Sequence, residues 1–137
     1  MKVSDVIDKA VSLGACRQSG KATDWKSLCW LFFSPQGIEF CKNANYPTIE
    51  MFREMKPNIR PYCVYVEDSV AKENENVALI GCFSSELFFS GVEKAYKVIL
   101  MHGATAVIHI SNYAVVRVEN ISGMFNIIND GTGKVLV

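Results

Sequence analysis

The last 61 residues of the chain, 77–137, alternate short apolar runs with glycine or asparagine. The runs begin near seven positions spaced 8 to 11 residues apart: Val77, Glu86, Tyr96, Thr105, Tyr113, Gly123 and Lys134. This spacing predicts serial short β-strands joined by tight turns. Only eight of these residues are charged, against twenty in the first 76. Because so little charge is present to solvate a free β-surface, we expect much of that surface to be covered.

Three arrangements of these strands fit the pattern. A sandwich or barrel fits, as does an antiparallel meander, because both use short strands at regular spacing. A short β-solenoid would use pairs of strands as rungs of roughly 19 to 20 residues. Residues 113–120 and 124–129 both end in asparagine, which a solenoid can stack at its turns. Successive units share little sequence identity, however, and this favours a sandwich or meander over a solenoid.

The first 57 residues show helical periodicity instead. From Val3 onward, apolar side chains recur at the i, i+3, i+4 and i+7 spacing of an amphipathic helix, which Gly14 is placed to end. A second helix is expected over residues 25–32, because Thr23 or Asp24 can cap its first turn.

Two further helices are expected in the same region. The third should run from Pro35 through Cys41 and break within the asparagine-containing residues 43–45. The fourth should begin at Pro47, whose fixed φ suits the first helical position, and end before Pro57. The N-terminal region is therefore predicted to be a cluster of four short helices.

A polar stretch separates the helical region from the β-region. Residues 62–66 are β-branched and aromatic and predict a strand, whereas the strongly polar residues 68–76 predict an exposed loop or linker. Because each half would be marginally stable alone, we expect a single α+β domain whose N-terminal helices pack on a C-terminal all-β unit. The expected division is the whole domain 1–137, a helical subregion 1–57, a strand and polar connector 58–76, and a β-rich subregion 77–137.

Charge and hydropathy argue against several classes of protein. Fourteen basic and fourteen acidic residues cancel and no basic cluster occurs, so the chain is poorly equipped to neutralise nucleic-acid phosphates. Residues 98–116 lack charge, but their histidines, glycine and asparagine disfavour a membrane helix and indicate two paired strands. The first residues alternate charged and apolar side chains, unlike a secretory signal. We expect a cytoplasmic protein that binds neither nucleic acid nor membranes.

The cysteines show no metal-binding spacing. No CxxC or CxxH occurs among the five, which are Cys16, Cys29, Cys41, Cys63 and Cys82. Free thiols in a reducing compartment are the expected state. Cys16 is a weak candidate for a catalytic nucleophile, because it precedes Arg17 in an expected loop, although no histidine lies near it in sequence.

His102 and His109 are the only histidines and the other weak catalytic candidates. On one continuous strand their odd separation would place them on opposite faces, whereas a turn at Gly103 would let them meet on adjacent strands. No further ligand stands at a selective spacing, so we expect no metal and no cofactor. Residues 131–134 lack the pattern of a phosphate-binding loop and are expected to form a hairpin turn.

These patterns favour a non-catalytic structural or protein-interaction module that self-associates through its charge-poor β-half. A homo-oligomer or a complex with a protein partner is the expected state. The alternative is a small-ligand binding module, with a pocket where the aromatic helices meet the sheet. The third hypothesis is an enzyme that uses His102 or His109 with a neighbouring carboxylate.

Overall fold

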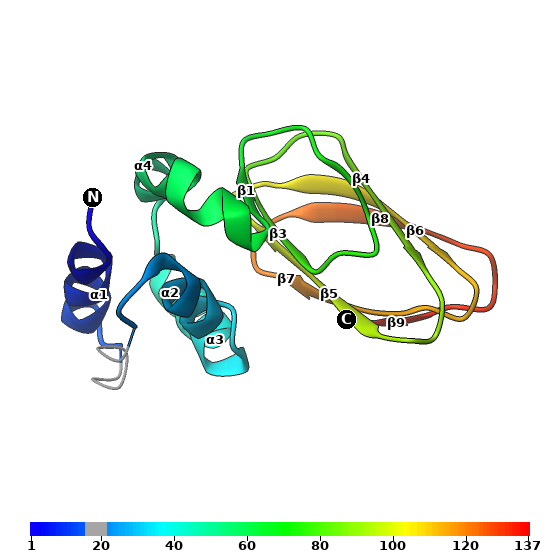
Figure 1. Cartoon of the computed structure of the whole chain (residues 1–137), viewed down its shortest axis with the longest axis horizontal. Helices are drawn as coiled ribbons and strands as arrows, with labels where there is room; N and C mark the ends of the chain where they lie inside the picture. The colour runs from blue at the N-terminus through cyan, green and yellow to red at the C-terminus, as the bar shows by residue number, and fades with distance from the viewer. Residues whose placement is uncertain (16–21) are drawn as a thin grey trace. The chain divides into compact units, whose positions relative to one another are not determined.

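The structure, a computed structural model, describes residues 1–15 and 22–137. Four α-helices are followed by nine β-strands in these residues, so the α+β class predicted from the sequence is confirmed (Figure 1). The chain forms two compact units, Met1–Tyr62 and Cys63–Val137. The predicted packing of the helices on the β-unit stays a prediction.

Each helix of the first unit has a side chain that accepts a hydrogen bond at its start. The helices are α1 Val3–Ser12, α2 Trp25–Phe32, α3 Pro35–Ala44 and α4 Ile49–Ile59, followed by the 3-10 turn η2, Arg60–Tyr62. Asp24, Ser34 and Thr48 accept the third amide of α2, α3 and α4 at 2.7, 3.2 and 3.2 Å. In α1, Asp5 accepts the amide of Lys2 at 2.9 Å. No helix in the described ranges is long and apolar enough to cross a membrane.

The fourth helix differs from its predicted bounds at both ends. Pro47 precedes the capping residue Thr48 instead of starting the helix, and α4 continues through Pro57 to Ile59. One face of α4 buries Phe52, Met55 and Ile59, and burial of Ile59 favours the extra turn. A proline in the last turn removes little of the hydrogen-bond ladder, so this packing prevails over its helix-breaking tendency.

The strands of the second unit form two parallel sheets. Their order is β1-β3-β5-β7-β9 in sheet A and β2-β4-β6-β8 in sheet B. Consecutive strands therefore lie in opposite sheets, and each strand pairs with the strand one turn further along the chain. The strands are β1 Val64–Val66, β2 Ala71–Glu73, β3 Val77–Ile80, β4 Ser85–Ser90, β5 Ala95–Met101, β6 Thr105–Ser111, β7 Val115–Asn120, β8 Met124–Asn129 and β9 Lys134–Leu136.

This arrangement is a parallel β-solenoid of about three turns (Figure 1). The preference for a sandwich or meander is wrong, because all strand pairs in both sheets are parallel. The predicted strand positions are confirmed, since β3 to β9 begin within two residues of the seven predicted starts. The strand predicted over residues 62–66 is confirmed for its last three residues, as β1, whereas Tyr62 belongs to η2.

Three local predictions fail because consecutive strands change sheets. Residues 98–116 span β5 and β6, which belong to opposite sheets and do not pair. The turn at residues 131–134 joins β8 to β9 across the sheets and is no hairpin. The polar residues 68–76 contain β2 and so belong to the first turn of the solenoid.

The turns of the solenoid differ in length. Val64 pairs with Ala78, fourteen positions further on, whereas Val77 pairs with Val98, twenty-one positions further on. Later partners in sheet A are twenty and nineteen positions apart. The first turn is therefore short, and the later ones approach the 19 to 20 residues expected of a rung.

The interior between the sheets is filled by rows of apolar side chains. In sheet B, Leu87, Ile108 and Ile127 occupy successive strands in one row, and the first two are fully buried. The backbone of Gly123 lies close to that of the preceding turn: a Cβ on Gly123 would be 2.5 Å from the carbonyl oxygen of Ala104. That position therefore requires glycine for space.

Hydrogen bonds between successive turns stabilise the corners of the solenoid. Ser84, His102 and Tyr113 have left-handed backbone conformations, with φ of 50°, 55° and 64°. Each donates its amide to a hydroxyl one turn later, on Thr105, Ser122 and Thr132 respectively, at 2.9 to 3.0 Å. Asn120 and Asn129 do not stack on each other, because they lie in different sheets and each side chain accepts an amide of its own turn.

Candidate interaction surface

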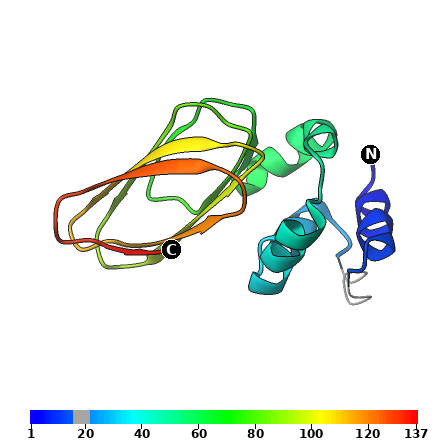
Figure 2. The same ribbon diagram turned by 180° about the vertical axis from the view of Figure 1, so that it is seen from behind.

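The outward side chains of β4, β6 and β8 form a surface that we call the sheet B face. Strand alternation places Phe88, His109 and Ile128 in one outward row, next to a row of Glu86, Val107 and Asn126. Glu86 is the only acidic or basic residue in the three strands, histidine aside. Figure 2 shows β6 and β8, yellow and orange, lying side by side.

Several apolar side chains on this face are exposed. Ile128 is 55% exposed and Phe88 is 39% exposed, and Met124, at the start of β8, is 74% exposed. Soluble proteins usually place polar side chains on the outer face of a sheet. This face therefore combines little charge with several exposed apolar side chains.

His109 lies in the outward row between Phe88 and Ile128. Its ring stacks on that of Phe88, with centroids 4.4 Å apart and planes inclined by only 9°. Its Nε2 atom is buried and has no hydrogen-bond partner within the described residues. Buried polar atoms without a partner are rare in folded proteins. The row thus contains a polar atom whose hydrogen-bonding capacity is unused.

The sheet B face ends at the edge of β8. In the described ranges of the chain β8 pairs only with β6, and β9 only with β7. The amides of Met124 and Asp130 donate to the carbonyl groups of Ala104 and Ile110, at 2.9 and 3.0 Å. Because alternate residues of a parallel strand bond to the same neighbour, the amides and carbonyls of residues 125, 127 and 129 face away from β6.

This edge of β8 lacks the usual protection of edge strands. Its sequence, Met124-Phe-Asn-Ile-Ile-Asn129, contains no charge and no proline, although edge strands usually carry such residues to prevent pairing. Phe125, Ile127 and Val135 extend the interior rows here and are only half-buried. We call β8 and the neighbouring Val135 of β9 the open end of the solenoid.

The opposite end of the interior is polar. Lys72 lies in the same inward row as Leu87, and its Nζ is 5.4 Å from the centroid of the Tyr65 ring. The Tyr65 hydroxyl donates to Glu75 at 3.4 Å, and the Cys63 thiol lies 3.9 Å from the same carboxylate oxygen. Burial raises the pKa of Tyr65, and the nearby Cys63 and Glu75 raise it further. We call Cys63, Tyr65, Lys72 and Glu75 the polar cap.

The two histidines do not form a site together. His102 lies in the turn between β5 and β6, where its amide donates to Ser122 at 2.9 Å. His109 lies within β6, four residues or roughly 13 Å of extended strand beyond Thr105. No cluster of three or more histidine, cysteine or acidic residues suited to a metal ion occurs in the described ranges.

The described cysteines are all free thiols, and three of them are buried. Burial raises the pKa of Cys29 and of Cys41 to about 12, so both stay protonated near neutrality. Cys82 is buried in the solenoid, where its thiol donates to the carbonyl of Tyr65 at 3.2 Å, and burial raises its pKa as well. Cys16, the predicted nucleophile, lies outside the described residues.

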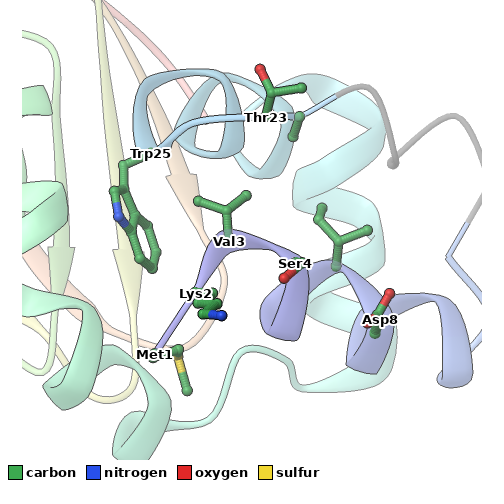
Figure 3. A pocket seen from close by; sticks show the side chains of 9 residues that line it. Met1, Lys2, Val3, Ser4, Asp8, Thr23 and Trp25 are labelled. Carbon is green, nitrogen blue, oxygen red and sulfur yellow. The ribbon is translucent and has the colours of Figure 1, made fainter.

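A hollow occurs within the helical unit. It lies between the start of α1 and the residues that lead into α2, and its volume is about 610 Å³ (Figure 3). The indole of Trp25 lines it together with the charged side chains of Lys2 and Asp8. The hollow is open to solvent and of the size that small ligands occupy.

Comparisons with known protein families, characterised proteins and solved structures found nothing that matches this chain. The assignment of a function therefore depends on the geometry of its own surfaces.

Proposed function

We propose that the protein is a non-catalytic interaction module that self-associates through its charge-poor solenoid. The observation that carries this proposal is the open end: a six-residue edge strand without charge, next to half-buried interior side chains. Such an edge offers unpaired amide and carbonyl groups to another strand. Covering it would also remove Phe125 and Ile127 from water, and burial of apolar area drives most protein association.

The sheet B face supports the same proposal. Phe88 and Ile128 remain partly exposed there, and the buried Nε2 of His109 has no partner in the residues described. An exposed apolar surface that adjoins an unprotected edge is typical of an interface rather than of a solvated surface. The same row offers no carboxylate to act with His109, because its neighbours in register are Phe88 and Ile128.

Light scattering coupled to size-exclusion chromatography tests the proposal over a wide range of protein concentration. We expect the mass to rise from 15.3 kDa in dilute solution to a multiple of that value in concentrated solution. A mass that stays at the monomer value at every concentration would refute self-association.

The hollow beside Trp25 supports small-ligand binding as a second candidate function. The size of the hollow and its mixture of aromatic and charged side chains suit a small polar molecule. A thermal-shift screen of nucleotides, sugars and amino acids should then give a stabilisation that Trp25→Ala abolishes. Trp30→Ala is the matched control, because Trp30 is 75% exposed and does not line the hollow.

A further inference from the structure

We propose that two copies of the chain join open end to open end, through antiparallel pairing of β8 with β8 about a two-fold axis at Ile127. This inference rests on the proposed self-association and specifies where it occurs. The strand would then carry an ordinary ladder on both sides, to β6 of its own chain and to β8 of the second copy.

The backbone of β8 has the symmetry that such pairing requires. The residues whose amides and carbonyls face the edge are Phe125, Ile127 and Asn129, which are symmetric about Ile127. In an antiparallel pair, residues with edge-facing groups exchange two hydrogen bonds with the residue directly opposite. Ile127 would therefore face Ile127 of the second copy, and Phe125 would face Asn129.

The side chains of β8 are compatible with this register. The inward Ile127 side chains of the two copies would meet and shield each other from water, whereas exposed Asn126 would lie opposite exposed Ile128. No charged residue lies in the strand, so no like charges face each other. A strand with charges of one sign at these positions would lack this self-complementarity.

Other edges of the solenoid are poorer partners for β8. The edge of β9 is only three residues long and begins with Lys134, and β2 has the sequence Ala71-Lys-Glu73. Stacking the open end on the polar cap would desolvate Lys72 and Glu75 against apolar side chains, which is costly. The pairing therefore closes into dimers instead of extending into filaments.

Three double variants with substitutions at the same exposed positions test the register. Asn126→Lys with Ile128→Lys places two like-charged pairs across the axis, and we expect the dimer dissociation constant to rise at least tenfold. Asn126→Glu with Ile128→Lys places an oppositely charged pair at each of those sites, and we expect dimerisation to return to within a few-fold of the wild-type value. Asn126→Glu with Ile128→Glu repeats the repulsion with the opposite sign, should the lysine variant fail to fold.

Dissociation constants from sedimentation equilibrium distinguish the outcomes, with circular dichroism to show that each variant is folded. A monomeric wild-type protein would refute the proposed self-association itself. A dimeric wild type whose like-charged variants dimerise equally well would keep self-association but exclude the β8 edge. If the glutamate–lysine variant stays as weak as the like-charged variants, the antiparallel register is wrong.

Discussion

The two ends of the solenoid differ in the side chains that complete its interior. At the first turn the inward side chain of β1, Tyr65, is buried, whereas Phe125 and Ile127 at the last turn are only half-buried. At the first turn, Lys72 and Glu75 close the row with polar groups that water can solvate. At the last turn, Ile127 and Phe125 continue the apolar rows to the edge. Repeat proteins need polar terminal repeats for solubility, so the difference identifies the end at which contacts are expected.

The largest expected change in the free energy of unfolding concerns Ile108 and Ile127, which lie next to each other in one interior row. Ile108→Ala should lower the free energy of unfolding by about 2–5 kcal/mol, because Ile108 is fully buried. Ile127→Ala should cost only about 1 kcal/mol in dilute protein, because its side chain is half-buried. Urea unfolding measures both. Equal losses in dilute solution would mean that the open end is already covered in the monomer.

A smaller effect is expected at the polar cap. Lys72→Met keeps most of the aliphatic stem but removes the ammonium group above the Tyr65 ring, and the loss should be about 0.5–1 kcal/mol. Lys134→Met is the control at the opposite end, where the lysine is exposed and the change should stay within about 0.5 kcal/mol. If the two variants unfold at the same urea concentration, the ring contact contributes nothing to the cap.

The smallest effect is a dependence of stability on alkaline pH. The folded-state pKa of Tyr65 is above its ordinary value of 10.0, so the folded protein keeps the phenol proton where the unfolded chain releases it. The contribution of Tyr65 to stability is therefore complete below pH 10 and is lost as the pH rises towards the folded-state pKa. Tyr65→Phe should show a shallower fall in unfolding free energy above pH 10. Identical slopes for variant and wild type would exclude Tyr65 as a cause.

Local structure could be predicted from the sequence because local residues determine it. Asp24, Ser34 and Thr48 are helix caps, and the two helices after Asp24 and Ser34 begin as their patterns predict. Glycine and asparagine between apolar runs also mark the starts of β3 to β9. The end of α4 could not be predicted in the same way, since burial of Ile59 outweighs the local preference of Pro57.

The pairing of the strands could not be predicted, because alternation of inward and outward residues is the same in a meander and in a solenoid. Only the register shows that β4 pairs with β6. The strand β2 has little strand propensity and forms because it pairs with β4. The sheet B face was missed for the same reason: Phe88, His109 and Ile128 are about twenty residues apart in sequence and meet only when the turns stack. The charge-poor composition was the one local sign of it.

The coiling of the chain also has a consequence for how the protein is made. Every strand of the solenoid pairs with residues 14 to 21 positions away, so the sheets contain no long-range closure between distant segments. In such repeat structures each turn contacts only its neighbours, so folding can begin at any turn and spread to the next. Each coil can therefore dock on the preceding one soon after it leaves the ribosome.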